Sequence, residues 1–525
     1  MDTIIVPVDG ASNIKLEVLD FDTLATVFSR SAVTPVTEAE GLKYNCTGEE
    51  CSWFDREIQG LPETMHQAKV IAPVSRGASG GLVGRDNTLI EVPGRSLTLA
   101  YTQEYPEQVE EVFRKLAGGA EEFFLETGSV RDLPGSLTLM KRFLFEETMR
   151  LEVLARAECF GTLGVLLSGY FLGEDYLGAV RIAGNEHTYW MCHTGARDIN
   201  HTAGTPASLC TRIESFGGLV PEKPHLVYEP LGRMPRKQAS GLGLARAPVV
   251  IAGGHDTCLS HIPVMSTFYQ AFPHRAGAPV IHLEAGTWTM AVRIGGPAHL
   301  PEDGYQRDIL VQGTVDGHPV VVARYGGGND FKHLRELALK RGIQFGKEPD
   351  EILLAEILSA ADCFVLPNIS PVNRLTGPFP HVQGKIINEP AFFRSGQRAF
   401  LVANLSSAIT TSVQLGHIAG KDRVPVILTA GGSRDRYFRR LIATLAPGEV
   451  YAMFDSHGRA ISETTALGAA IVGKAACLDT HPYRVDLSSL GISYRRVEPF
   501  SDQISRELDH YRDRFIREVK KADRA

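Results

Sequence analysis

The sequence lacks several features that would indicate particular classes of protein. None of its eight cysteines forms a Cys-x-x-Cys pair, so we expect reduced, mostly buried thiols and no zinc site. No apolar run is long enough to span a bilayer, which argues against a membrane protein. The chain also lacks an excess of positive charge. Its formal net charge of −7 gives no electrostatic support for binding nucleic acid or acidic membranes.

The remaining composition is that of an ordinary globular protein with more than one domain. Hydrophobic residues make up 43% of the chain and charged residues 22%, as in typical soluble domains. A chain of 525 residues is too long for one core, so we expect at least two domains. The N-terminus enters a strand pattern without a basic segment followed by an apolar one, so we expect no secretion signal and a cytoplasmic location.

The most informative stretch is residues 249–257, which read VVIAGGHDT. A β-branched run that ends in two glycines predicts a buried strand and a sharp turn, with the backbone close to a bound molecule. Asp256 and Thr257 then suit the N-cap of a following helix. A carboxylate is thereby placed at the carboxyl end of a strand, where open α/β sheets bind ligands. Alone, the stretch leaves both a helix cap and a catalytic turn open.

The same pattern of a strand-like run ending in glycine and small polar residues occurs three more times. These runs are IIVPVDGASNIK at 4–15, VIHLEAGTW at 280–288 and VPVILTAGGS at 424–433. Such turns expose backbone N–H groups and small hydroxyls, which suit phosphate oxygens. One such turn is common in any α/β protein. Four of them, one with a carboxylate and another with a lysine, favour a nucleotide site assembled from distant segments.

Apolar periodicity divides the chain into two α/β halves, with a boundary close to Asp256. Further strands are expected at 16–21 and 70–74 and near 309 and 320. Helical spacing is found at 105–116, 137–157, 331–341, 351–360, 434–445, 463–476 and 501–522. The charges of the last helix indicate a solvated face rather than a binding patch. We therefore predict domains at 1–258 and 259–525.

In this order, the motifs resemble those of the FGGY carbohydrate kinases, most closely the rhamnulokinase and L-fuculokinase branch, over nearly the whole chain. The segments that carry the resemblance are the first phosphate loop at 10–15, WFD at 53–55, the sugar segment SRGAS at 75–79, the catalytic GHDT at 254–257, the second phosphate loop GTW at 286–288, and the adenosine region GGS at 431–433 with ETTALGAA at 463–470.

The resemblance implies two actin/hexokinase-like (ribonuclease H-like) α/β domains around a central cleft. The N-terminal domain would bind a sugar and the C-terminal domain ATP with Mg²⁺. The aspartate that matches Asp256 would act as general base on the sugar hydroxyl that attacks the γ-phosphate. This fits the residues, because phosphoryl transfer needs positioning and charge neutralisation more than covalent catalysis.

Further roles follow from the resemblance alone. Lys15 would place a point charge on phosphate or, alternatively, is an exposed strand lysine. Arg324 would contribute to sugar specificity or, alternatively, form a structural salt bridge, and Trp288 belongs to the core, to the sugar wall or to both. The sugar contacts implied are Gly77, His255, Thr257 and Arg324, and the ATP contacts are Ala11, Ser12, Asn13, Lys15, Thr287, Gly431 and Gly432.

The first phosphate loop departs from the family pattern. The family's loop reads Asp-x-Gly, with an aspartate that helps to hold magnesium through water, whereas this chain has Val8 at that position and a carboxylate at Asp9. Neighbouring side chains of a strand face opposite ways, so Asp9 would point away unless a bulge re-aims it. We assign Asp9 as the candidate residue that holds Mg²⁺ through a bound water. Whether the chain transfers phosphate efficiently stays an open question at this point.

The leading hypothesis is an ATP-dependent kinase of a ketose, either a methylpentulose such as L-rhamnulose or L-fuculose or another ketopentose. The alternative is a catalytically impaired relative that binds sugar or nucleotide as a sensor. Another ATPase of the same fold fits poorly, because it would have no use for the sugar-side segments. The residues leave open the sugar, the hydroxyl that is phosphorylated and the oligomeric state, including a homodimer.

One cysteine-containing motif receives no chemical role. Cys192 lies beside His193, but no matching ligand cluster supports a metal or nucleophilic site. The run Cys192-His193-Thr194, with Asp198, resembles a motif of one sub-branch of the family. We interpret it as structural.

Overall fold

The computed structural model describes residues 1–183, 207–220, 224–296, 300–346, 350–373, 376–461 and 463–524. Their contacts divide the chain into two compact units. The first comprises Met1–Gln270, Leu310–Val320 and Glu463–Gly491, and the second Ala271–Ile309, Val321–Ser462 and Ile492–Ala525. The predicted mixed α/β class is confirmed. The predicted domain boundary after residue 258 stays a prediction. The two contact-based units differ from the predicted domains, because residues 463–491 pack with the first unit.

The first unit is built on a mixed sheet whose central strands come from the N-terminus. Its elements are β1 (Asp2–Asp9), β2 (Asn13–Asp20), β3 (Thr26–Val33), α1 (Thr47–Gln59), β6 (Gln67–Ile71), β7 (Val74–Ser75), β11 (Pro230–Arg233), α10 (Arg236–Gly241), β12 (Val249–Ile251), β13 (Gly254–His255), α11 (Asp256–Ser260) and α19 (Thr464–Leu478). The strand order is β11-β12-β6-β1-β2-β3, and β7 pairs with both β1 and β13. The strand β1 is antiparallel to β2 and parallel to β6 and β7.

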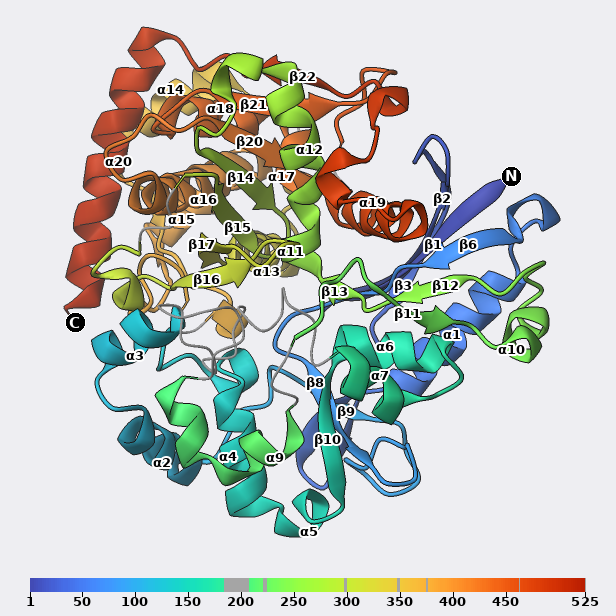
Figure 1. Cartoon of the computed structure of the whole chain (residues 1–525). Helices are drawn as coiled ribbons and strands as arrows, with labels where there is room; N and C mark the ends of the chain where they lie inside the picture. The colour runs from blue at the N-terminus through green and yellow to red at the C-terminus, as the bar shows by residue number, and fades with distance from the viewer. Residues whose placement is uncertain are drawn as a thin grey trace. The chain divides into compact units, whose positions relative to one another are not determined.

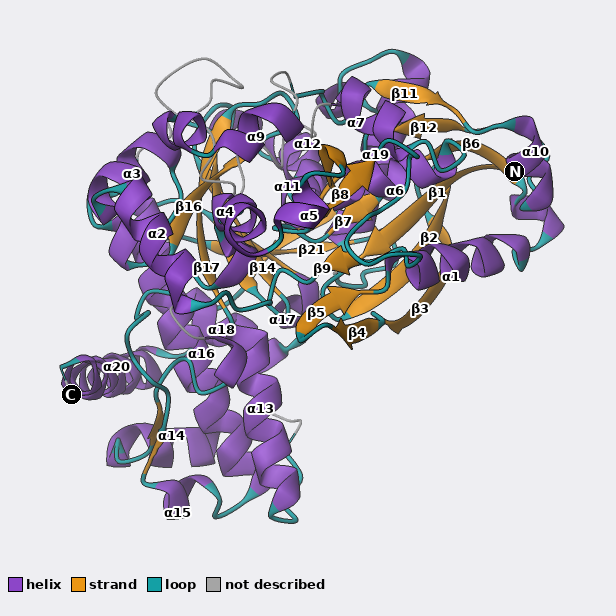
Figure 2. Ribbon diagram, turned by 90° about the horizontal axis from the view of Figure 1, so that it is seen from below, coloured by secondary structure: helices purple, strands orange, loops and turns teal. Residues whose placement is uncertain are grey.

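Helices cover both faces of this sheet, which explains why β1 is apolar on both sides. Ile4 and Val6 belong to the core cluster that includes residues of α19, whereas Ile5 belongs to the cluster that includes Phe54 of α1. Figure 1 shows α19 (red) against β1 and β6 (blue), and Figure 2 shows α1 alongside β2 and β3. The apolar composition of α19 is satisfied by this packing, and for this reason residues 463–491 join the first unit.

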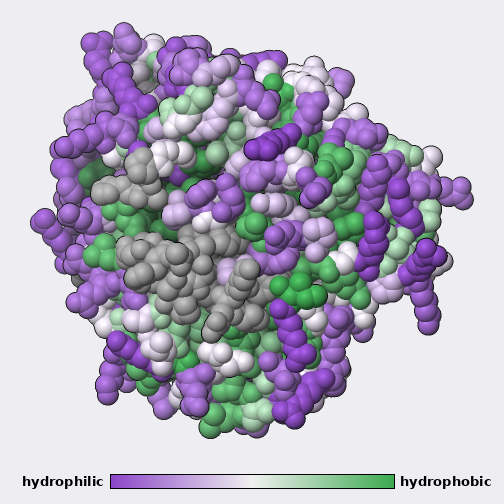
Figure 3. Space-filling view, in the orientation of Figure 1, coloured by the Kyte–Doolittle hydropathy of each residue, from purple (hydrophilic) through white to green (hydrophobic). Residues whose placement is uncertain are grey.

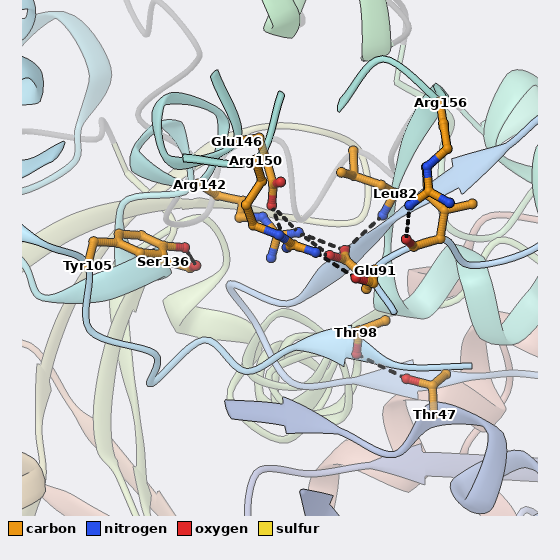
Figure 4. A network of polar contacts seen from close by, with 11 residues as sticks. Thr47, Leu82, Glu91, Thr98, Tyr105, Ser136, Arg142, Glu146, Arg150 and Arg156 are labelled. Carbon is orange, nitrogen blue, oxygen red and sulfur yellow. Dashed lines mark hydrogen bonds and ion pairs between the residues drawn. The ribbon is translucent and has the colours of Figure 1, made fainter. Parts of the chain in front are cut away.

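A second layer of the first unit carries a dry network of charges. Its elements are β4 (Val36–Ala39), β5 (Leu42–Asn45), β8 (Gly80–Gly84), β9 (Thr98–Leu99), α2 (Glu107–Ala117), α3 (Ala120–Thr127), α4 (Met140–Met149), α5 (Leu151–Leu154), β10 (Ala157–Thr162), α6 (Leu163–Phe171), α7 (Tyr176–Ala183) and α9 (Glu214–Leu219). Glu91 accepts hydrogen bonds from Arg142 at 2.7 Å, from Arg150 at 3.0 Å and from the Leu82 N–H at 3.1 Å. Figure 4 shows these side chains converging, and they join α4 to β8, the strand that directly follows the segment 75–79.

The second unit contains a sheet of its own. Its elements are β14 (Val280–Ala285), β15 (Thr289–Ile294), β17 (Pro319–Tyr325), α13 (Gly327–Lys340), α14 (Glu351–Ala360), β18 (Phe364–Val365), β19 (Ile386–Ile387), α15 (Glu389–Phe392), α16 (Gly396–Ala419), β20 (Val426–Thr429), α17 (Ala430–Arg434), α18 (Arg436–Leu445), β21 (Val450–Phe454), β22 (Ser493–Arg496) and α20 (Asp502–Asp523). Neighbouring strands follow the order β17-β15-β14-β20-β21-β22. Two further elements, α12 (Ile262–Ala271) and β16 (Ile309–Gly313), run across unit boundaries, and so does β17, whose first two residues belong to the first unit.

Most predicted helices and strands agree with these elements, but the helix predicted at 137–157 is divided into α4 and α5, and residue 157 already belongs to β10. The helix predicted at 351–360 is α14 residue for residue, and those at 331–341, 434–445, 463–476 and 501–522 are α13, α18, α19 and α20 within a few residues. The run at 70–74 is interrupted, because β6 ends at Ile71 and β7 begins at Val74.

The face drawn in Figure 3 carries many hydrophilic side chains. Among the described residues, no helix combines the length and the apolar character needed to cross a membrane. Figure 3 shows hydrophilic side chains (purple) spread over the face drawn there, interspersed with hydrophobic ones (green). Most large apolar residues of the described chain are buried.

Candidate active site

Three predicted site segments meet at one edge of the first sheet. The parallel strands β1 and β7 place Asp9 opposite Ser75, and β7 and β13 place Ser75 opposite His255. The first phosphate loop, the sugar segment and the catalytic segment, which are far apart in the sequence, therefore end side by side. Two of the four glycine-bounded runs, 4–15 and 249–257, thus end at the same sheet edge, whereas the runs at 280–288 and 424–433 belong to the sheet of the second unit.

Asp256 has one carboxylate oxygen held by the protein. Its Oδ1 accepts the Thr257 N–H at 2.7 Å and the Thr257 hydroxyl at 3.3 Å, and it lies 3.1 Å from His255 Nε2. No described residue bonds to Oδ2, and the side chain is 37% exposed. The carboxylate is thus oriented through one oxygen, and the other can accept a proton. Asp256 begins α11 and His255 is the N-cap residue, so the observed cap lies one residue before the predicted Asp256.

The residues around Asp256 are much less exposed. Thr257 is 7% exposed and His255 is 3% exposed. Gly77, the predicted sugar contact of the neighbouring segment, is half-buried, and the following residue, Ala78, is buried with a left-handed φ of 55°. A non-glycine residue adopts this conformation at a cost, and such positions concentrate at functional sites.

Asp9 lies in a buried cluster of three charges. Its Oδ1 forms an ion pair with Arg76 Nη1, and Arg76 Nη2 lies 3.3 Å from Glu50 Oε1 in α1. The exposed fraction is 0% for the Asp9 and Glu50 side chains and 3% for Arg76. Burial raises the pKa of Asp9 well above its ordinary value, and the positive charge of Arg76 opposes this shift. The cluster ties the first loop to the sugar segment.

The strand geometry around Asp9 explains why its carboxylate does not reach solvent. The pairing of β1 with β2 continues through Val8 and Asp9 without a register shift, so no bulge re-aims either side chain. Val8 packs against the core cluster on the α19 face, and Asp9 faces Glu50. Magnesium prefers exposed oxygen ligands and bound water. The geometry therefore does not favour Asp9 as the magnesium residue, and that role stays a prediction.

The predicted ATP contacts of the first loop lie on a tight, exposed turn. The Gly10 N–H donates to the Asn13 carbonyl at 3.1 Å, and a Cβ at Gly10 would lie 2.7 Å from that oxygen, so the turn requires glycine. Ala11, Ser12 and Asn13 are exposed. Lys15 is partly exposed and pairs with Glu463 at 2.9 Å, directly before α19. Its ammonium lies on the protein surface, where a phosphate would compete with this carboxylate.

The second unit has a cavity at the ends of β14 and β20. These strands are parallel, with Glu284 opposite Thr429, so the loops that follow them are adjacent. The cavity measures about 460 Å³, and the predicted ATP contacts Thr287, Gly431 and Gly432 all line it. The complete lining is Ala285, Gly286, Thr287, Thr289, Gly327, Gly328, Phe331, Lys332, Arg335, Asn404, Ser407, Gly431, Gly432, Asp435 and Phe438.

Glycine makes this cavity in two ways. A Cβ at Gly432 would lie 2.5 Å from Ala285 Cβ, so this glycine permits close packing of the loop. A Cβ at Gly286 or Gly431 would meet no heavy atom closer than 3.5 Å, so these glycines keep space free. Ala430 is held at a φ of 59° at the start of α17. The loop therefore presents backbone to the cavity rather than side chains.

Two cations at the cavity are not among the sequence predictions. Lys332 and Arg335, both exposed, lie one turn apart on α13, directly after the glycines at its start. Their i, i+3 spacing puts them on one face of the helix, which is the signal that could have identified them. Asp435 also lines the cavity and caps α18 by accepting the Tyr437 and Phe438 N–H groups at 2.8 and 3.0 Å.

Arg324 is engaged in a buried ion pair. Its Nε donates to both oxygens of Asp308 at 2.8 and 2.9 Å, and the Arg324 side chain is 3% exposed. Burial raises the pKa of Asp308 to about 6, and the charge of Arg324 opposes this shift. The guanidinium also lies 5.7 Å from the centre of the Trp288 ring. The structural alternative left open for Arg324 is therefore present, and its role in sugar specificity stays a prediction.

Two sequence interpretations concern metal chemistry. Cys192, His193, Thr194 and Asp198 lie outside the described residues. Within the described part of the chain, no three His, Cys, Asp or Glu side chains come together as metal ligands.

The match to known sequences lies in the second half of the chain. Residues 278–479 match the family model described as carbohydrate kinase FGGY, C-terminal domain. This part of the chain is therefore similar to the FGGY carbohydrate kinases. The predicted relationship to these phosphotransferases is thereby confirmed, whereas the rhamnulokinase and L-fuculokinase branch stays a prediction. Comparison with curated protein sequences found no significant match.

Solved structures are similar to this chain over nearly its whole length. A carbohydrate kinase from Novosphingobium aromaticivorans shares 22% identity at a TM-score of 0.72, with 99% of each chain covered. A ligand-bound xylulose kinase from Lactobacillus acidophilus shares 14% at 0.75, and a Plasmodium falciparum glycerol kinase with ADP shares 13% at 0.71; both cover 99% of this chain and 98% of theirs. These likenesses confirm the predicted sugar-kinase fold.

Proposed function

We propose that this chain is an ATP-dependent kinase that transfers the γ-phosphate of ATP to a hydroxyl of a ketose, with Asp256 as general base. The observation that carries this proposal is the arrangement of Asp256, in which Oδ1 accepts two hydrogen bonds from Thr257 and lies 3.1 Å from His255 Nε2, while no described residue bonds to Oδ2. A base oriented through one oxygen is suited to a hydroxyl that approaches the other. The FGGY domain at 278–479 supports the same assignment.

The residues of the first unit act on the sugar. Oδ2 of Asp256 accepts the hydrogen bond of the reacting hydroxyl and then its proton, while Thr257 and His255 hold the carboxylate in place. The backbone at Gly77 and Ala78 lies at the neighbouring strand end and supplies the surface on which the sugar rests. Positioning of this kind contributes strongly to phosphoryl transfer, where little covalent chemistry is required of the protein.

The residues of the second unit fit a nucleotide. ATP, when bound, supplies the phosphoryl group. The space in front of Gly286 and Gly431 admits an extended ligand close to the backbone, and Lys332 and Arg335 provide positive charge for phosphate. The cavity volume of about 460 Å³ lies within the range of small-molecule sites. Thr287 is exposed at this cavity and is the hydroxyl we assign to a phosphate oxygen.

Magnesium fits this chain less well than ATP does. Kinases bind Mg²⁺ through one or two carboxylates together with phosphates and water, and the ion neutralises charge on the phosphates. Asp9 is fully buried in its ion pair with Arg76, whereas Asp256 keeps an accessible oxygen. We therefore assign no step to Asp9. The cytoplasmic location and a homodimer remain predictions.

The substrate we propose is a methylpentulose, such as L-rhamnulose or L-fuculose, or another ketopentose. Similar structures are named as xylulose, gluconate and glycerol kinases. A panel of L-rhamnulose, L-fuculose, xylulose, gluconate and glycerol therefore covers both the sequence prediction and the names of these neighbours. We expect ADP release to depend on one of the two methylpentuloses or on xylulose.

The decisive experiment is a coupled ADP-release assay over this panel with wild-type protein and Asp256→Asn. The substitution keeps the shape of the side chain but removes the base, so we expect kcat to fall by about 10³-fold. Asp86→Asn, on an exposed turn of the same unit, is the matched control and should leave turnover unchanged. The proposal fails if no sugar stimulates ADP release or if Asp256→Asn retains full turnover.

A second candidate function rests on Val8 and on the burial of Asp9. A chain without the usual acidic residue in its first loop would bind sugar or nucleotide as a sensor without efficient transfer. It predicts thermal stabilisation by ligand, about 2.7 kcal/mol at 100 times the Kd, without sugar-dependent ADP. Measurable sugar-dependent turnover would exclude this alternative.

A further inference from the structure

A row of side chains lies behind the Asp256 carboxylate in the first unit. His255 Nε2 is 3.1 Å from Asp256 Oδ1, and His255 Nδ1 is 3.3 Å from Cys258 Sγ. The thiol in turn lies 3.6 Å from Oε1 of Gln312. His255 is 3% exposed, and Cys258 and Gln312 are both 0% exposed. Both ring nitrogens of His255 therefore face protein groups, and only Asp256 extends to solvent.

The number of protons available restricts this arrangement. An ionised carboxylate only accepts hydrogen bonds, so Nε2 must carry a proton to bond with Asp256. A neutral imidazole has one N–H, which leaves Nδ1 as an acceptor that needs a donor. The group facing Nδ1 is the Cys258 thiol, which has a single proton to give. The acceptors near the thiol include Nδ1 and the more distant Gln312 oxygen.

We propose that Cys258 donates to His255 Nδ1 and thereby fixes His255 as the neutral Nε2–H tautomer, which makes His255 and Cys258 positioning residues for Asp256. The inference deepens the proposed kinase function and rests on it for its kinetic consequence. With this tautomer, Nε2–H and the Thr257 N–H both address Oδ1, so Oδ2 is directed to the substrate. In the opposite tautomer, the lone pair of His255 Nε2 would face a lone pair of Asp256 Oδ1.

This assignment changes the role of His255 from that implied by the resemblance. A sugar contact would require a ring nitrogen turned toward the ligand. Both nitrogens instead lie within hydrogen-bond distance of Asp256 and Cys258, and the ring is almost fully buried. His255 thus acts on the sugar through Asp256. A thiol serves here because it is small, apolar in most of its surface and still a weak donor.

The first test is spectroscopic and needs no catalytic activity. The full chain is labelled with ¹⁵N-histidine, and the His255 signals are assigned from their loss in His255→Gln. We expect a protonated Nε2 and an unprotonated Nδ1 at pH 8. In Cys258→Ala, which removes the donor, the Nδ1 resonance should move as the tautomers mix. An Nδ1–H tautomer, an imidazolium, or a signal unaffected by Cys258→Ala would overturn the inference.

The second test is kinetic and separates positioning from folding. Cys258→Ala should lower kcat about 10-fold while KM for ATP and sugar stays within about twofold, and Cys258→Ser, which keeps a donor, should recover most of kcat. Cys363→Ala is the matched control, because Cys363 is 1% exposed in the second unit and its thiol contacts only a backbone carbonyl among the described residues. Equal kcat in wild type and Cys258→Ala, or equal losses for Ala and Ser, would contradict the proposal.

The two tests also separate this inference from the proposed function. If the wild-type protein phosphorylates no sugar, the kinase assignment fails, but the ¹⁵N spectra still decide whether Cys258 fixes the tautomer. If turnover is present and the spectra show the Nδ1–H form, the kinase stands and the positioning role falls. Melting temperatures of each variant identify any loss that comes from unfolding.

Discussion

The two units hold their candidate binding loops in different ways. In the first unit, charged and polar side chains fix the strand ends: Asp9 pairs with Arg76 and Glu50, and Asp256 is oriented by His255. In the second unit, the loops after β14 and β20 consist largely of glycine and small residues around a cavity of about 460 Å³. One unit orients individual atoms, and the other keeps space open.

This difference suits the two ligands that we propose. A base must point at one proton, and directional contacts in a dry setting achieve this. A nucleotide is long and presents phosphate oxygens, which bind backbone N–H groups where no side chain intervenes. Both units share one device, an alanine held in the left-handed region beside the candidate ligand surface, Ala78 at a φ of 55° and Ala430 at 59°.

The largest expected effect comes from breaking the charge cluster of the first unit. Arg76→Met leaves Asp9 and Glu50 buried without their cation, so we expect a loss of about 3–5 kcal/mol in the free energy of unfolding. Urea denaturation measures it. The control Arg341→Met removes an exposed pair with Glu389, 48% and 49% exposed, and should cost less than about 1 kcal/mol. Similar losses of unfolding free energy in both variants would show that the buried cluster stabilises the fold no more than an exposed ion pair does.

The next largest effect concerns the loss of stability at low pH that the buried His261 of the first unit causes. His261 is fully buried, and burial lowers its pKa to about 4. Its neutral form is present in the folded state, whereas the unfolded chain takes up a proton below about pH 6.5. The stability contribution is therefore complete above that pH and is lost as pH falls toward 4, by about 3 kcal/mol in total.

The variant His261→Gln isolates this contribution. Between pH 6.5 and pH 4 we expect its melting temperature to fall less steeply than that of the wild type. His318→Gln is the control, because the His318 side chain is 78% exposed and should leave the slope unchanged. Parallel curves for wild type and His261→Gln would contradict the predicted titration.

The open cavity of the second unit is tested by filling it. Gly431→Val adds a side chain where a Cβ meets no atom closer than 3.5 Å, so the fold is retained and the nucleotide loses room. We expect the Kd for ATP to rise about tenfold by calorimetry. Gly416→Val, on the exposed surface of α16 with nothing within 4 Å, should bind ATP as the wild type does. Unchanged binding by Gly431→Val would place the nucleotide elsewhere.

The smallest effect concerns the left-handed alanine that each unit has beside its candidate ligand surface. Ala78→Gly and Ala430→Gly relieve a left-handed alanine, and we expect each to raise the free energy of unfolding by about 0.5 kcal/mol after the entropy cost of glycine. Ala360→Gly, in the last turn of α14, should lower it by about 1 kcal/mol. Melting temperatures that move in the same direction for all three would rule out relief of strain.

Much of the fold could be predicted because its signals are local. Apolar periodicity gives α14 at its observed bounds and places β14, β20 and α11 within a few residues of their positions. The glycine-bounded strand ends likewise predict that distant loops share a sheet edge, as β1, β7 and β13 do. These signals survive because strand and helix preferences depend on neighbouring residues.

Other features could not be predicted because their partners are distant in the sequence. Glu50 and Arg76 lie 26 residues apart, and no local pattern in either segment predicts that they form an ion pair. The place of α19 in the first unit depends on a face shared with Ile4 and Val6, hundreds of residues earlier. Lys332 and Arg335 look like ordinary surface residues until the cavity beside them is known.

By itself, the sequence determined the two-part α/β character and the strand ends that carry glycine, and it predicted Asp256 as the carboxylate of the candidate site. Tertiary structure alone decided which oxygen of Asp256 is held, that Asp9 turns inward to Arg76 while Val8 faces α19, and that residues 463–491 complete the first unit. Residue patterns encode local conformation, whereas burial and charge pairing exist only once distant segments are packed together.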